Sequence, residues 1–143
     1  MGYHSTFLIV TFVFGILFSL LYLAGVIPDK PKVVIVIIPE GSSLPTSEHN
    51  NFEPAVIKVI IGINNTVRWV NQDSTFSSIR ADEDASDPQF WRATHLDEIS
   101  NVNLLLSPGD TFEFTFTKPG EYGYHSEPHP HKHGTVIVLE PQE

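Results

Sequence analysis

The sequence predicts an all-β domain, a two-sheet sandwich or barrel of seven to eight short strands. Short segments rich in β-branched or aromatic residues recur along the chain, and Gly, Pro, Asn and Ser separate them. Residues 111–117 alternate strictly between apolar and polar side chains, which is typical of a strand with one buried face. Many short strands with turn signals between them indicate two packed sheets.

The first element is an apolar segment that predicts a membrane anchor over residues 1–28. No charged side chain occurs from Ser5 to Ile27, and this run is longer than the roughly 20 residues that a spanning helix needs. A cleaved secretory signal, the alternative, has a shorter apolar core and a small-residue cleavage pattern, which this segment lacks. We therefore expect an uncleaved, single-pass helix. Taken alone, Lys30 and Lys32 after it would favour a cytoplasmic domain.

Residues 29–143 are expected to form one domain. Predicted strands cover 32–38, 55–61, 66–71, 76–80, 111–117, 121–126 and 135–140. Residues 81–103 begin with an acidic cluster and show no regular period, so we expect a long excursion, with room for a helical turn. Alternation places Trp69 and the three phenylalanines of 111–117 inward. It also points Tyr124 inward, so His125 should face outward.

Composition excludes several classes of function. The chain has 17 acidic and 8 basic residues and a formal charge of −9, which argues against a nucleic-acid partner and favours a metal cation or a basic protein. It has no cysteine, so disulfides, zinc–thiolate sites, iron–sulfur clusters and thiol nucleophiles are excluded. No nucleophile–base pair or phosphate-binding loop is recognisable in the sequence, and we expect no enzymatic activity.

Two segments resemble a known family. Residues 65–74 (NTVRWVNQDS) and 106–138, which include the run HSEPHPHKHG, are similar to plastocyanin- and amicyanin-like cupredoxins, especially the membrane-anchored archaeal type. The resemblance covers roughly residues 40–140. It implies a Greek-key β-sandwich and one-electron transfer through a blue copper ion. It also implies a domain on the extracytoplasmic side of the cell membrane, opposite to the weak lysine signal.

The resemblance implies a copper ligand set that this chain does not keep. The family has a His shortly after the W-x-N-x-D strand, and Cys, His and Met before the last strand. These four positions fall on Ser77, Ser126, His129 and Lys132, so three ligands are missing. Blue copper requires a thiolate, and a lysine ammonium repels a metal cation. We therefore do not expect the electron-transfer activity of the family, and an altered electron carrier is the weakest alternative.

A group of histidines offers a different metal site. His125, His129, His131 and His133 lie close together in the sequence, and His95 lies on the excursion. On an extended segment the alternating His129, His131 and His133 would share one face, and His95 could reach back toward them. Neutral imidazoles bind copper, so we expect a pale, nitrogen-ligated copper(II) site suited to copper binding, delivery or storage. A solvated loop that binds metal weakly is the plain alternative.

Two partners are consistent with this pattern. A copper-accepting protein would follow from the metal site. Alternatively, the domain has lost its metal and is an accessory or structural subunit of a membrane enzyme complex, with residues 81–103 contacting the partner. The missing ligands favour this second interpretation, and the density of histidines favours the first.

Overall fold

The computed structural model describes residues 30–83 and 87–143. The predicted anchor, residues 1–28, lies outside the described residues and stays a prediction. Within the described ranges, no helix is both long and apolar enough to cross a membrane. The compact unit described below is Pro31–Glu143.

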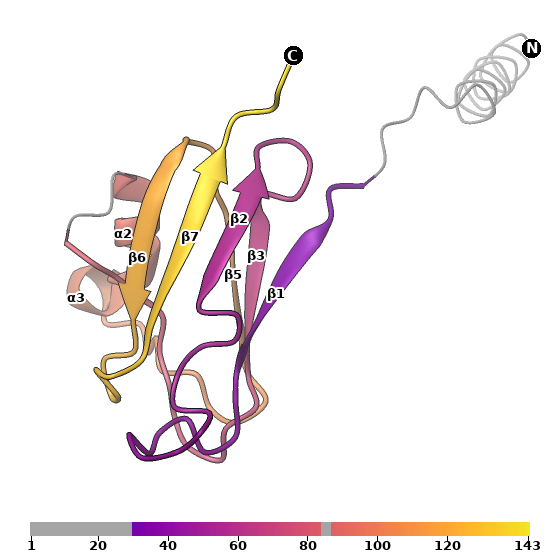
Figure 1. The fold of residues 1–143 in the computed structure, drawn as a ribbon. Helices are drawn as coiled ribbons and strands as arrows, with labels where there is room; N and C mark the ends of the chain where they lie inside the picture. The colour runs from indigo at the N-terminus through magenta and orange to yellow at the C-terminus, as the bar shows by residue number, and fades with distance from the viewer. Residues whose placement is uncertain (1–29, 84–86) are drawn as a thin grey trace, which may run out of the picture. The chain divides into compact units, whose positions relative to one another are not determined.

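Seven strands form two sheets that face each other. The first sheet has the order β1-β3-β5, with β1 at Val33–Ile38, β3 at Thr66–Asn71 and β5 at Thr111–Thr115. The second has the order β2-β7-β6-β4, with β2 at Val56–Ile60, β7 at His133–Leu139, β6 at Gly120–His125 and β4 at Arg80–Ala81. Successive strands alternate between the sheets until β6, and β6 and β7 then pair directly (Figure 1). This confirms the predicted sandwich.

The main difference between the predicted strands and the structure concerns residues 76–80, which do not form a continuous strand. Ser77 forms an isolated bridge with Leu106, just before the first sheet's β5, whereas Arg80 and Ala81 pair with β6 of the second sheet. The segment therefore crosses from one sheet to the other. It cannot pair continuously with either, so only β4 remains as a strand.

The excursion contains two short helices, more than the single turn expected. Helix α2 spans Pro88–Thr94 and helix α3 spans Leu96–Ser100. The Asp87 side chain accepts a hydrogen bond from the Gln89 N–H at 2.8 Å, and Pro88 occupies the first helical position, where its missing N–H costs nothing. The Thr94 hydroxyl accepts a bond from the Ala81 N–H. The excursion is thereby fastened to the edge strand β4.

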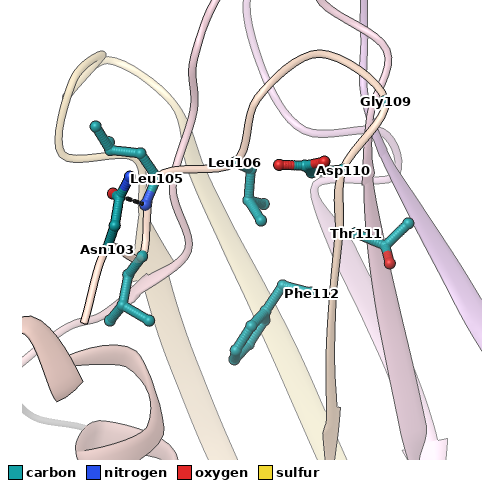
Figure 2. Close-up of a pocket in the computed structure, with 8 residues that line it drawn as sticks. Asn103, Leu105, Leu106, Gly109, Asp110, Thr111 and Phe112 are labelled. Carbon is teal, nitrogen blue, oxygen red and sulfur yellow. Dashed lines mark hydrogen bonds between the residues drawn. The ribbon is translucent and has the colours of Figure 1, made fainter.

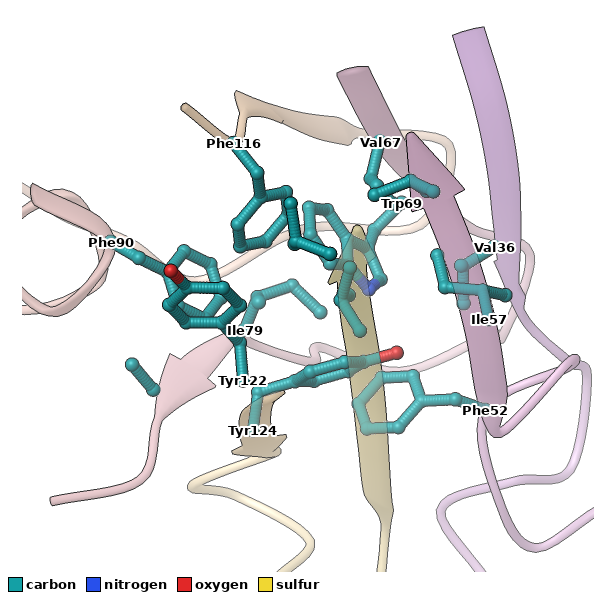
Figure 3. Packing of buried hydrophobic residues seen from close by; sticks show 14 of the residues in the cluster. Val36, Phe52, Ile57, Val67, Trp69, Ile79, Phe90, Phe116, Tyr122 and Tyr124 are labelled. Atoms are coloured by element: carbon teal, nitrogen blue, oxygen red, sulfur yellow. The ribbon is translucent and has the colours of Figure 1, made fainter. Parts of the chain in front are cut away.

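Aromatic side chains dominate the core between the sheets (Figure 3). Trp69 and Tyr124 are fully buried and meet edge to face, with ring centroids 5.4 Å apart. Phe90 enters from helix α2 and lies 5.0 Å from Phe116 and 6.1 Å from Tyr122. Such pairs add to the free energy gained by burying apolar surface. Because Phe90 is one of the fully buried rings, the excursion is part of the core.

One glycine sets the spacing of β6 and β7. Gly134 lies opposite Tyr124 in the antiparallel register, and a Cβ there would collide with the Tyr124 ring and hydroxyl. Because residue 134 has no Cβ, the Tyr124 ring can pass beneath β7 into the core. The two strands can then pair up to His125 and His133, where the connecting loop begins.

A surface pocket of about 520 Å³ lies elsewhere, between residues 103–106 and 109–112 (Figure 2). Leu105 and Phe112 supply apolar side chains, and the Asn103 side chain accepts a bond from the Leu105 N–H at 3.0 Å. None of the candidate histidines lines it. The pocket therefore has no part in the site described below.

We expect Phe90→Ala to lower the free energy of unfolding by about 3–5 kcal/mol, because it leaves a cavity among packed rings. Ile99→Ala, in the same excursion but 51% exposed, should cost less than about 1 kcal/mol. Urea denaturation followed by tryptophan fluorescence measures both. Equal, small effects would mean that the excursion does not pack on the core.

Candidate functional site

A buried carboxylate organises the end of the sandwich at which the β1–β2, β3–β4 and β6–β7 loops meet. Asp73 is 2% exposed and accepts bonds from the backbone N–H groups of Gly41, Ser43 and Ser74 at 2.8–3.1 Å. Burial by itself raises the pKa of Asp73, but these N–H donors outweigh it and hold the pKa below its usual value. Asp73 is therefore a fixed negative charge that brings the 41–43 loop to the site.

The loop between β6 and β7 folds tightly inward. The Ser126 N–H donates to the Lys132 carbonyl at 3.2 Å, and the Lys132 N–H donates to the His129 carbonyl at 2.9 Å. Closed in this way, the loop buries both the Ser126 and the Lys132 side chains completely. The residues between them stay at the surface or only partly buried.

The Lys132 ammonium occupies the interior of this end. Its Nζ donates to Ser77 Oγ at 3.0 Å and to Ser42 Oγ at 3.4 Å, and it lies 5.8 Å from the centre of the Phe52 ring. Ser126 Oγ is 3.2 Å from Ser77 Oγ and completes the hydroxyl network. Burial lowers the pKa of Lys132 to about 8, and the negative charge of Asp73 opposes part of that change.

His129 and His131 lie over this interior network. The His129 Nε2–H donates to the Phe76 carbonyl at 3.2 Å, and the His131 Nε2–H donates to the Ser42 carbonyl at 2.8 Å. Their ring centroids are 6.2 Å apart. Burial, followed by the charge of Lys132, lowers the pKa of His129, so this ring is neutral at pH 7.

His125 and His133 form a second pair at the ends of β6 and β7. They are direct partners in the antiparallel register, and their ring centroids are 6.4 Å apart. The His125 Nδ1–H donates to Asp82 Oδ1 at 2.6 Å. His125 faces outward, as its position after Tyr124 predicted.

His95 lies apart from both pairs, at the junction of α2 and α3. It is 8% exposed, stacks on Trp91 with centroids 4.2 Å apart, and its Nδ1–H donates to the Trp91 carbonyl at 2.8 Å. The candidate histidines are thus two pairs and a single residue. Over residues 30–83 and 87–143, no three His, Cys, Asp or Glu side chains are grouped so as to hold one ion.

The expected common face of His129, His131 and His133 is not present in this structure. The expectation assumed an extended segment, but the bond from the Lys132 N–H to the His129 carbonyl turns the loop back on itself. His133 then belongs to β7 and faces His125.

Comparison with known proteins identifies the family. The model of the cupredoxin-like domain matches residues 13–138, most of the chain. The chain belongs to the cupredoxin-like family. This confirms the resemblance drawn from the two sequence segments, and the family relationship supports a copper-related or electron-transfer function.

Individual relatives include a plastocyanin and an amicyanin. The plastocyanin of Tetradesmus obliquus is 35% identical over 78 residues, which cover 54% of this chain and 50% of the relative. The amicyanin of Paracoccus denitrificans is 23% identical over 112 residues, or 78% and 76% of the two chains. This chain spans about half the length of the plastocyanin.

Solved structures agree with the fold. A purple cupredoxin from Nitrosopumilus maritimus superposes with a TM-score of 0.57 at 27% identity and covers 74% of this chain and 99% of that one. A copper-containing nitrite reductase from Thermus scotoductus also gives 0.57 at 27% identity, over 79% of this chain but 24% of the enzyme.

The interior residues do not fit the blue copper ion that the resemblance implies. Ser77, Ser126 and Lys132 stand where it places His, Cys and Met, and the structure brings all three together with His129 nearby. Hydroxyl groups are poor ligands for copper, and the ammonium places a positive charge in the site. Each polar side chain of the network has at least one hydrogen-bond partner within it, without an ion.

Two members of this network were missed by sequence reasoning. Ser42 comes from a loop far away in the chain and belongs to no recognisable motif. Asp73 completes the W-x-N-x-D pattern, which could have indicated it, since an acidic residue after a buried Trp and Asn suggests a buried loop anchor.

The buried lysine predicts an unusual pH dependence of stability. An unfolded lysine keeps a pKa near 10.4, so between pH 8 and about 10 the unfolded chain binds a proton that the folded chain has released. Stability therefore rises with pH in this window. We expect a gain of about 1–2 kcal/mol from pH 7 to pH 9.5, absent in Lys132→Met and retained in Lys58→Met, which replaces an exposed lysine.

Urea denaturation at several pH values measures this gain. Burial raises the pKa of Tyr122 and that of Tyr124, the latter to about 12, so these tyrosines lower stability slightly as the pH approaches 10. Both are present in the wild type and in Lys132→Met, and the comparison of the two profiles removes their contribution. Identical pH profiles for the wild type and Lys132→Met would contradict the buried position of the ammonium.

Proposed function

We propose that this protein is a copper-handling cupredoxin that binds copper(II) through surface histidines of the β6–β7 hairpin and not at the interior position. The observation that carries this proposal is the Lys132 ammonium bonded to Ser77 and Ser42 inside the sandwich. A positive charge held there replaces the metal ion and leaves the imidazoles as the available nitrogen ligands. In this proposal residues 1–28 anchor the domain to the extracytoplasmic face of the cell membrane.

The histidines suit binding, delivery or storage better than electron transfer. A blue centre depends on a copper–thiolate bond, and this chain contains no cysteine. Imidazole ligands at a surface produce a pale copper(II) centre that exchanges its ion readily with a partner. A copper-accepting protein is the partner that this chemistry requires.

A second candidate function is a metal-free accessory subunit of a membrane enzyme complex. It is favoured by the self-contained network of Lys132, Ser77 and Ser126, which needs no ion. Exposed apolar residues of the excursion, Ile99 and Val102, would contact the partner. Detergent extraction distinguishes the two, because an accessory subunit leaves the membrane within a larger assembly.

Copper titration tests the first proposal. We expect the full chain in detergent to bind copper(II) with a pale spectrum and nitrogen hyperfine structure in paramagnetic resonance. Replacing His125, His129, His131 and His133 together by Asn should weaken binding at least a hundredfold. Ser126→Ala, which changes only the interior, should leave affinity unchanged. A fourfold variant that still binds as the wild type does would exclude the surface histidines.

Restoring the family's ligands tests whether Lys132 closes the interior. We expect Ser77→His, Ser126→Cys and Lys132→Met combined to take up copper with the intense visible absorption of a copper–thiolate bond, because His129 completes the set. Ser77→His with Ser126→Cys, retaining Lys132, should bind far more weakly. Equal absorption in both variants would show that the ammonium is no obstacle.

A further inference from the structure

We infer that His125 and His133, with Asp82 behind His125, form the binding site for one copper(II) ion on the outer face of the β2-β7-β6-β4 sheet. The inference rests on the proposed function and states which of the hairpin histidines hold the ion. It replaces the loop site, in which three alternating histidines converge, with a site built on two paired strands.

The strand register places the two ligands opposite each other. His125 is the last residue of β6 and His133 the first of β7, and they are direct partners in the antiparallel ladder. Side chains at such positions rise from the same face with Cβ atoms about 5 Å apart. Their ring centroids are 6.4 Å apart. Rotation about the side-chain bonds can close this gap to the roughly 2 Å metal–nitrogen distances that each ring requires.

Asp82 prepares one of these rings for a metal. Its carboxylate accepts the His125 Nδ1–H at 2.6 Å, which leaves the Nε2 lone pair of the neutral ring free. A carboxylate behind a ligating histidine fixes the tautomer and the orientation of the ring and increases its basicity. The structure shows this arrangement for His125 alone among the hairpin histidines.

The backbone provides room for the carboxylate. The Asp82 N–H donates to the Gly123 carbonyl at 2.9 Å, which places the Asp82 side chain over Gly123. A Cβ at Gly123 would collide with the carboxylate oxygen. The absence of a side chain there allows Asp82 to reach diagonally to His125. Gly123 and His125 on β6, His133 on β7, and Asp82 directly after β4 thus contribute to one site.

The other histidine pair is less suited to a cation. His129 donates its Nε2–H to the Phe76 carbonyl of the β3–β4 loop, and His131 donates its Nε2–H to the Ser42 carbonyl of the β1–β2 loop. These bonds hold each ring against a different loop. Burial, and after it the nearby Lys132 charge, lowers the pKa of His129. The same positive charge repels a metal ion.

Charges around the outer pair favour a cation. Arg80 is the register partner of His125, but its guanidinium is paired with Asp97 at 2.6 Å, Glu98 at 2.7 Å and Glu127 at 3.5 Å. Its positive charge is therefore compensated by these carboxylates. Asp82 adds a further negative charge beside the rings. Two imidazoles select copper(II) over nickel and zinc by the usual order of stability.

Copper(II) titration of the full chain in detergent, with glycine as competing chelator, tests the inference. We expect His125→Asn and His133→Asn each to weaken binding at least tenfold. Asp82→Asn should weaken it about tenfold, because the ring loses its orienting carboxylate. The competing pair, replaced as His129→Asn with His131→Asn, should stay within about threefold of the wild type, and Ser126→Ala, which changes only the interior, is the control. Paramagnetic resonance of the wild type should show coupling to two nitrogens.

The outcomes separate this inference from the proposed function. Loss of binding in the His129/His131 variant, with binding retained after His125→Asn, would overturn the inference but keep copper on the hairpin. If the His125, His133 and Asp82 variants, the His129/His131 variant and the fourfold variant all bind copper(II) with wild-type affinity, both this inference and the proposed function are overturned. Circular dichroism of each variant shows whether it is folded, and the exposed position of His133 makes His133→Asn the safer of the two single changes.

Discussion

A buried lysine charge is the constraint on which this end of the sandwich depends. An ammonium removed from water is costly unless donors and charges compensate it. Lys132 has two hydroxyl acceptors, Ser77 and Ser42, and the more distant charge of Asp73. The loops that carry these groups must therefore approach one another closely. Asp73 in turn must stay ionised, and the backbone N–H donors around it ensure this. One side chain thus fixes the positions of three loops.

The buried Lys132 ammonium also excludes a metal ion from the interior, so the proposed copper site lies at the surface. The family resemblance implies copper at this end of the sandwich, but here the Lys132 ammonium lies there and donates to Ser77 Oγ. His131 donates to the Ser42 carbonyl, and Lys132 donates to the Ser42 hydroxyl. Ser42 is therefore bonded both to a histidine at the surface of the β6–β7 loop and to the lysine in the interior. A metal ion drawing His131 away would disturb that network. The pair on β6 and β7 carries no such cost.

The sequence was sufficient for the sandwich but not for the grouping of the histidines. Alternation located β3 and the inward face carrying Trp69, because one face of a strand in a two-layer core must be apolar. The resemblance placed Ser77, Ser126 and Lys132 at one site, and the structure brings them together. Pattern reasoning treated the histidine segment as extended. It could not foresee a turn closed by backbone hydrogen bonds, nor Ser42, which reaches the site through tertiary folding alone.

A site on paired strands differs physically from a site on a loop. The hydrogen-bonded ladder of β6 and β7 fixes the separation of His125 and His133 before any ion arrives, so little conformational entropy is lost on binding. In a loop site His129 and His131 would have to converge on one ion while each ring stays bonded to a carbonyl of a different loop, Phe76 for His129 and Ser42 for His131. Preorganisation therefore favours the strand pair even though the loop has as many imidazoles. The position of the pair at the surface, with Asp82 beside it, also leaves the remaining coordination positions open to a partner that takes the ion.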